Sequence, residues 1–145
     1  MGCVGDSFKD RYQVISNDFL FYSYVINRAK LKNDCIPGFN GFSQKYKSDI
    51  FEWLNTQEYT PDDSYFFYLN YTPIGNRMFF TEANGIKIDG IRQKIEELRN
   101  KKIISEDEYY FLLASMMESI TKVSNTSGTY EAFFKFWDSR SEKGF

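Results

Sequence analysis

The second half of the chain carries the most regular hydrophobic pattern. From Thr81 onward, apolar residues recur at helical spacing, at Ile88, Ile91, Ile95 and Leu98. Ser105 and Glu108 form a capping-box pattern that opens a second periodic stretch, with apolar residues at Tyr109, Leu112, Met116, Ile120 and Val123. Because the connection between the two stretches is short, the pattern predicts a long helical hairpin over residues 81–124.

The first half is less regular and predicts one short β element. Residues 12–16 are rich in β-forming residue types and form a short run, which is typical of a buried strand. The segment 19–31 predicts a helix, because apolar residues recur at helical spacing, at Phe19, Tyr22, Ile26 and Ala29. A turn is predicted at 37–41 and a shorter helix at 49–55.

The remaining segments are interpreted from their composition. Residues 65–71 are aromatic and predict an irregular strand or a loop, and 72–76 predict a turn. A polar break at 124–128 precedes a last predicted helix over 130–137. The expected fold class is therefore mainly α with a short β element: one βα unit followed by a mostly helical region.

Composition narrows the possible functions. Of 145 residues, 42% are hydrophobic and 26% charged, which favours a packed core over disorder. The chain has no histidine, which excludes Ser-His-Asp and Cys-His machinery within it and argues against a catalytic zinc site. The net charge of −2 does not indicate a nucleic-acid partner, although a basic surface can be confined to one face.

The cysteines and the hydrophobic runs bear on the compartment. Cys3 and Cys35 match no zinc signature, and we expect free thiols in a reducing cytoplasm. The sequence shows no signal segment and no long uninterrupted apolar run. We therefore expect a cytoplasmic protein without a membrane partner.

Three groups of residues carry a family resemblance. The first is Gly2 and Gly5 with the Phe-Lys pair at 8–9. The second is the Val-Ile-Ser-Asn-Asp run at 14–18, followed by Tyr-Ser-Tyr-Val at 22–25. The third comprises residues 80–92, 108–115 and 123–130. Together they resemble the D12 class of adenine-N6 DNA methyltransferases over nearly the whole chain, and least between about 35 and 68. The resemblance implies a remnant βα unit of a Rossmann-like methyltransferase fold at 1–35 and a helical target-recognition region at 36–145.

The resemblance implies an S-adenosylmethionine site in the first of these regions. Gly2 and Gly5 correspond to the tail of a glycine-rich cofactor loop, where a missing side chain lets the backbone approach a ligand. Asp18 follows the expected strand, where an acidic residue can accept hydrogen bonds from ribose hydroxyls, and Asn17 is its neighbour. The alternatives are an ordinary glycine turn and a simple helix cap at Asp18.

The second region is expected to contact double-stranded DNA. The candidate phosphate contacts are Arg77, Lys87, Arg92 and Lys94, followed by Arg99, Lys101 and Lys102. Candidate base or loop contacts are Asn125 and Tyr130, with Asn76 and Asn84 as further amides. The alternative for each cation is a solvated helix face, which Glu96 and Glu97 favour because they interleave with the basic residues.

One family motif has no counterpart in the sequence. Members transfer a methyl group to a flipped adenine with an Asp/Asn-Pro-Pro-Tyr loop, but Pro37, Pro61 and Pro73 are not adjacent to one another. No residue is therefore predicted to be catalytic or to bind a metal. We expect an internal fragment of a site-specific methyltransferase of a restriction-modification system, inactive alone, with weak or lost cofactor binding.

Other interpretations remain open at this point. A complementing chain could carry the catalytic motif, and the exposed edge of the strand at 12–16 predicts self-association. The chain could instead be a non-catalytic helical module that binds DNA or a protein, or a helical interaction domain unrelated to DNA. Cofactor binding that depends on Asp18 distinguishes the methyltransferase fragment from these modules.

Overall fold

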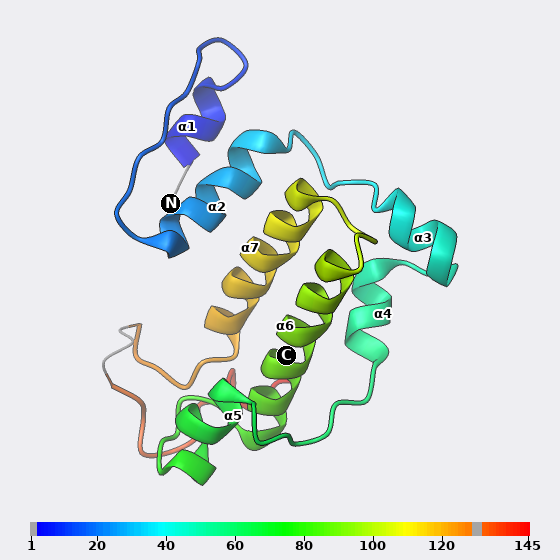
Figure 1. Ribbon diagram of the computed structural model, residues 1–145. Coiled ribbons are helices and arrows are strands. Elements are labelled where there is room, and N and C mark those ends of the chain that lie inside the picture. Colours follow the sequence, from blue (N-terminus) through cyan, green and yellow to red (C-terminus); the bar gives the residue numbers. More distant parts are fainter. Residues whose placement is uncertain (1–2, 129–131) are drawn as a thin grey trace. The chain divides into compact units, whose positions relative to one another are not determined.

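The computed structural model describes residues 3–128 and 132–145, and this part of the chain is helical (Figure 1). The helices are α1 (Cys3–Phe8), α2 (Phe21–Lys32), α3 (Asn40–Tyr46), α4 (Ile50–Thr56), α5 (Phe66–Tyr71), the 3-10 helix η1 (Pro73–Gly75), α6 (Glu82–Asn100) and α7 (Glu106–Lys122). Within the described residues there is no β-strand, only an isolated bridge between Thr126 and Phe133. None of the described helices is long and apolar enough to cross a membrane.

The chain divides into two compact units. The first comprises Met1–Glu52 and Ile95–Ser115, and the second comprises Trp53–Lys94 and Met116–Phe145. The long helices α6 and α7 each contribute one part to either unit. The functional division at residue 35 stays a prediction, since these units are defined by packing.

The helices α6 and α7 confirm the two predicted helices of the hairpin, and each begins with a side-chain cap. Thr81 Oγ1 accepts a hydrogen bond from the Asn84 N–H at 3.2 Å, which caps α6. At α7, the Ser105 N–H donates to Glu108 Oε2 at 2.7 Å and the Glu108 N–H donates to Ser105 Oγ at 3.3 Å. This is the reciprocal capping box expected from the sequence. The predicted apolar stripe of α6 is buried at Ile88, Ile91, Ile95 and Leu98.

The core of the first unit is built around Phe39. Its ring meets Phe51 edge-on at 5.7 Å and Phe111 at 6.3 Å between centroids, arrangements that aromatic rings favour. Phe39 has a left-handed backbone (φ 47°) and is followed directly by α3 at Asn40. The predicted turn at 37–41 is therefore right only in its first part. Gly41 is required here, because a Cβ would lie 2.6 Å from the Ile103 carbonyl oxygen.

The strand predicted at 12–16 is not formed, and the Rossmann-like remnant is not confirmed. Residues 13–18 have no regular secondary structure. A strand needs a neighbouring strand for its backbone hydrogen bonds, and the described residues offer none. The helix predicted at 19–31 is present as α2, but Phe19 lies outside it and is 100% exposed. The predicted apolar positions Ile26 and Ala29 are buried, and Ser23 and Val25 are buried beside them.

The prediction for 65–71 was wrong, because residues 66–71 form the helix α5. The buried carboxylate of Asp89 accepts a hydrogen bond from the Tyr68 N–H at 2.8 Å and also receives the N–H groups of Phe66 and Phe67. These are the orphan donors of the first turn of α5. A cap that lies far along the sequence therefore decides between helix and strand.

The prediction of a helix at 130–137 was also wrong for residues 132–137, the part of this segment that the structure describes. This segment runs without helix and is held by Asn125, whose side-chain amide donates to the carbonyls of Phe134 and Phe136 at 3.1 and 3.0 Å. The Asn125 Oδ1 accepts from the Asp138 N–H at 3.0 Å. A buried amide thus replaces the backbone partners that a helix would have provided.

Candidate functional site

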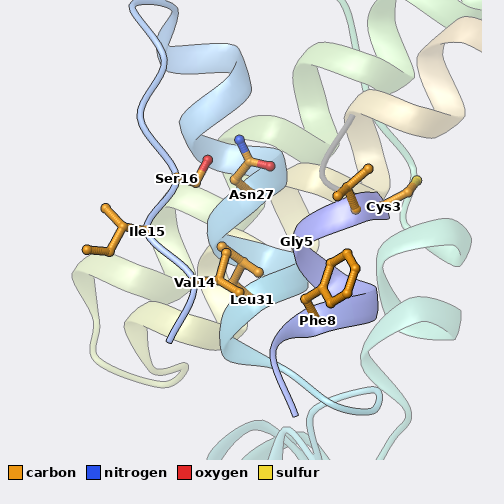
Figure 2. A pocket seen from close by; sticks show the side chains of 9 residues that line it. Cys3, Gly5, Phe8, Val14, Ile15, Ser16, Asn27 and Leu31 are labelled. Carbon is orange, nitrogen blue, oxygen red and sulfur yellow. The ribbon is translucent and has the colours of Figure 1, made fainter. Parts of the chain in front are cut away.

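Two adjoining hollows lie in the first unit, between α1, the segment 14–18 and α2. The first, which we call the apolar hollow, has a volume of about 560 Å³. Figure 2 shows its side chains arising from α1, from the segment 14–16 and from α2. The lining residues are Cys3, Val4, Gly5, Phe8, Val14, Ile15, Ser16, Asn27 and Leu31.

The second hollow, which we call the charged hollow, has a volume of about 460 Å³. Its lining residues are Val14, Ser16, Asn17, Asp18, Tyr24, Asn27, Arg28, Leu31 and Lys32. Four residues line both hollows, namely Val14, Ser16, Asn27 and Leu31. The fold therefore brings Gly5 to one hollow and Asn17 with Asp18 to its neighbour. Gly2, the other predicted cofactor residue, lies outside the described residues.

Helix α1 is tied to the end of α2 by Lys9. The Lys9 Nζ donates to the carbonyl oxygens of Lys30 at 2.7 Å and Asn33 at 2.9 Å. It also lies 2.9 Å from an Asp6 carboxylate oxygen and 3.1 Å from one of Asp34. The hydrogen bond to Asp6 raises the pKa of Lys9, so the ammonium stays charged. A cation at the last carbonyls of a helix also interacts favourably with the helix dipole. The sequence did not predict this tether between Lys9 and the end of α2.

Gly5 serves close packing in this structure. It lies inside α1, and a Cβ at this position would meet Val14 Cγ1 at 3.2 Å and Leu31 Cδ2 at 3.3 Å. A larger residue would push α1 away from the two side chains shared by the hollows. The glycine was predicted to end a turn, whereas it brings helix and segment together.

Asp18 has an ionised and exposed carboxylate beside α2. Its Oδ1 accepts the Leu20 N–H at 2.9 Å. This hydrogen bond, with a smaller contribution from the Ser23 hydroxyl, lowers the pKa of Asp18. The carboxylate thus closes a turn just before α2, whose N-cap is Leu20 and has no side-chain cap hydrogen bond. The carboxylate also lines the charged hollow, so it can accept further hydrogen bonds from a ligand hydroxyl.

Arg28 supplies positive charge to the same hollow. Its guanidinium carbon lies 4.2 Å from the ring centroid of Tyr110, within cation–π range. The guanidinium donates to the Tyr24 hydroxyl at 2.8 Å and to Asp107 at 3.3 Å, while its buried Nε has no hydrogen-bond partner. The charged hollow thus combines a carboxylate, Arg28 and the exposed Lys32, and it suits a polar ligand with hydroxyl groups.

The predicted DNA contacts on α6 and near η1 are distributed over the surface. Arg92 is exposed, and Lys87 and Lys94 are half-buried. Arg77 is exposed, donates to the Asn70 carbonyl at 3.1 Å and lies 5.6 Å from the centroid of the Tyr71 ring. These four cations remain candidates for phosphate contacts.

Several other predicted DNA contacts have partners within the fold, and their role at DNA stays a prediction. Asn125 and Asn84 are buried, and their amides hold backbone carbonyls of the C-terminal segment. Arg99 forms two hydrogen bonds with the Glu106 carboxylate, at 2.7 and 2.8 Å, and Lys101 pairs with Glu97. These side chains stabilise the fold. Tyr130, the remaining predicted contact, lies outside the described residues.

Among the described residues, no cluster of carboxylates and cysteines could hold a metal ion. Both cysteines are free and exposed. The chemistry available in the hollows is therefore hydrogen bonding, charge pairing and apolar packing.

Comparison with known proteins establishes the family. The model of the D12 class N6 adenine-specific DNA methyltransferases matches residues 2–145. The chain belongs to this family. No solved structure matches the chain significantly.

The relatives that match the chain are named as modification enzymes. The chain is 57% identical to Modification methylase LlaI of Lactococcus lactis subsp. lactis, over 99% of this chain and 23% of that protein. It is 38% identical to Type II methyltransferase M.FokI of Planomicrobium okeanokoites, over 97% of this chain and 22% of that protein. It is 41% identical to Type II methyltransferase M.NlaIII of Neisseria lactamica, over 92% of this chain and 38% of that protein. The chain thus spans about a fifth to two fifths of the length of these relatives.

Proposed function

We propose that the chain is part of a type II DNA methyltransferase that transfers a methyl group from S-adenosylmethionine to N6 of adenine in DNA. The family match over residues 2–145 supports the reaction class. The names of the relatives support a place in restriction and modification. Both kinds of evidence concern the family, so the acceptor atom and the donor are part of the proposal.

The arrangement of the two hollows carries the cofactor part of the proposal. Phe8, Val14 and Leu31 line the apolar hollow, which suits the apolar faces of an adenine ring. Asp18 lines the adjoining charged hollow with an ionised carboxylate, which suits ribose hydroxyls. A nucleoside placed across Val14 would contact both groups. Gly5 contributes by keeping α1 close to that residue.

The acceptor in the proposal is double-stranded DNA. The cations Arg77, Lys87, Arg92 and Lys94 belong to the second unit and are the phosphate contacts of this proposal. We assign no catalytic step to this chain, because the Asp/Asn-Pro-Pro-Tyr loop has no counterpart among its residues. A complementing segment or chain would provide that loop and accept the amine proton of the flipped adenine.

A second candidate function rests on one observation, the exposed apolar side chains of Ile15, Phe19 and Phe21 before and at the start of α2, which we call the apolar run. Phe19 is 100% exposed, Ile15 84% and Phe21 65%. Large exposed apolar side chains that are close together along the chain are candidates for an interaction surface. The run supports a protein-interaction module, in which this surface binds either another part of the methyltransferase or a second copy of the chain.

Calorimetric titration of S-adenosylmethionine into the whole chain tests the proposal. We expect weak binding that Asp18→Ala abolishes, because the variant removes the ribose acceptor. Asp18→Asn keeps a side-chain oxygen for the Leu20 N–H and separates loss of folding from loss of charge. Asp10→Ala is the matched control, since Asp10 is exposed and outside both hollows. Wild-type chain that binds no cofactor, or binding that Asp18→Ala leaves unchanged, would remove the cofactor site from this chain.

A further inference from the structure

A third hollow lies in the second unit, between the end of α4 with the residues that follow it and the first turns of α6. Its volume is about 310 Å³, and we call it the amide hollow. The lining residues are Asn55, Gln57, Tyr59, Ala83, Ile86 and Lys87. This lining contains two carboxamides, one cation and one aromatic ring, and it contains no carboxylate.

The Tyr59 wall of the hollow is fixed in place. The Tyr59 hydroxyl donates to the Leu54 carbonyl at 2.7 Å. Burial raises the pKa of Tyr59 to about 12, so the hydroxyl keeps its proton and remains a donor. The ring packs on Gly90, where a Cβ would come within 2.2 Å of Tyr59 Cδ1. Gln57, two residues before Tyr59, lines the same hollow.

Two polar groups of the hollow are not used by the fold. Within the described part of the chain, the side chain of Gln57 makes no hydrogen bond and Lys87 forms no ion pair. This distinguishes Lys87 from Lys9, Arg99 and Lys101, whose charges are paired within the first unit. A half-buried amide and a half-buried cation on one hollow are thus available to a ligand.

The chemistry of these groups matches an edge of duplex DNA. A carboxamide carries a donor and an acceptor side by side, and the major-groove edge of adenine presents the N7 acceptor beside the N6 amine donor. A lysine within the same hollow can pair with a phosphate, which positions the protein on the duplex. The absence of a carboxylate from the lining avoids repulsion between the hollow and the phosphates.

We propose that the amide hollow is a DNA-reading subsite, in which Gln57 pairs with the major-groove edge of an adenine and Lys87 contacts a nearby phosphate. Asn55 supports the contact from the same wall. The inference rests on the proposed function, because it takes double-stranded DNA as the partner. It adds a specificity-determining residue, Gln57, and assigns Lys87 to a defined subsite.

The experiment uses the whole chain and short fluorescein-labelled DNA duplexes with a randomised centre. Duplexes bound by the wild-type chain are selected and sequenced, and affinities are then measured by anisotropy over a range of salt concentrations. The variants are Gln57→Ala, Asn55→Ala and Lys87→Gln. The controls are Gln44→Ala and Lys122→Gln, which change an exposed amide and an exposed cation outside the lining. Circular dichroism spectra and melting curves identify any variant that fails to fold.

The two kinds of contact give different results. We expect Gln57→Ala to weaken binding to the selected duplex about 5- to 150-fold and to lose the preference for one A·T pair. Lys87→Gln should weaken binding to every duplex and lower the salt slope by about one. The control variants should bind as the wild-type chain does.

The inference is overturned if Gln57→Ala keeps every base preference, or if the control variants weaken binding as strongly. Wild-type chain that binds duplexes without selecting any sequence also overturns it, while the DNA part of the proposed function stands. Wild-type chain that binds no duplex removes the DNA part of the proposed function, and the inference with it.

Discussion

The buried carboxylate of Asp89 on α6 accepts the backbone N–H of Tyr68 on α5 at 2.8 Å. The two residues are 21 positions apart, and the contact completes the first turn of a helix that has no local side-chain cap. Asp89 thus stabilises α5, while burial partly desolvates its own carboxylate. Burial is the main influence on this group and raises the pKa of Asp89, against the lowering effect of the N–H donors.

Removal of this carboxylate should destabilise the second unit. We expect Asp89→Ala to lower the free energy of unfolding by about 1–3 kcal/mol, because buried N–H groups of α5 lose their acceptor. Asp89→Asn keeps an oxygen for Tyr68 and should cost less. Urea denaturation followed by circular dichroism measures both values. Equal stability of Asp89→Ala and the wild-type chain would show that the cap does not hold α5.

The same group predicts a pH dependence. The folded-state pKa of Asp89 is higher than its ordinary value, so the folded chain retains this proton to a higher pH than the unfolded chain. The contribution of Asp89 to the free energy of unfolding therefore decreases as the pH rises through the interval above about 4. Denaturation at several pH values should show this decrease in the wild-type chain and its absence in Asp89→Asn. Parallel curves for the two proteins would contradict the assignment.

Asn125 should be among the most sensitive positions of the second unit. Its amide donates to the carbonyls of Met78, Phe134 and Phe136. Asn125→Ala leaves these part-buried acceptors without their donor, and we expect the free energy of unfolding to fall by about 1–3 kcal/mol. Amide hydrogen exchange should increase over residues 132–138. Asn100→Ala is the control, since Asn100 is exposed at the end of α6, and a similar loss there would argue against a special role of Asn125.

The contact between Gly90 and Tyr59 predicts a steric effect. Gly90→Ala places a Cβ against the Tyr59 ring, and relief of that overlap should cost about 1–3 kcal/mol. Thermal denaturation measures the loss. Gly144→Ala serves as the control, because no atom lies within 4 Å of the added Cβ. A Gly90→Ala chain as stable as the wild type would mean that the Tyr59 ring can move away from the added methyl group at little cost.

The exposed apolar run predicts self-association. We expect the wild-type chain to form larger species as its concentration rises, and Phe19→Ser with Phe21→Ser to reduce them. Size-exclusion chromatography with light scattering measures the change. Ile36→Ser removes an exposed apolar side chain outside the run and should have a smaller effect. A strictly monomeric wild-type chain at high concentration would contradict the prediction.

The local signals in the sequence determined α6, α7 and α2. The spacing of Ile88, Ile91, Ile95 and Leu98 and the capping box at Ser105 and Glu108 act within one or two helical turns. Such signals need no distant partner to take effect, so their positions along the chain predict the helices. The family resemblance likewise depends on residue order alone and was confirmed over residues 2–145.

Tertiary structure decided what depends on partners far apart in the chain. Residues 66–71 became helical because Asp89 caps them, and residues 132–137 stayed out of a helix because Asn125 holds their carbonyls. The amide hollow is likewise formed by two segments distant in sequence, which is why the presence of Gln57 and Lys87 in one hollow was not predicted. The Lys9 tether, which joins the end of α1 to the end of α2, was not predicted either. The residue types are visible in the sequence, whereas their neighbours are set by packing, and packing determines whether a polar group serves the fold or a ligand.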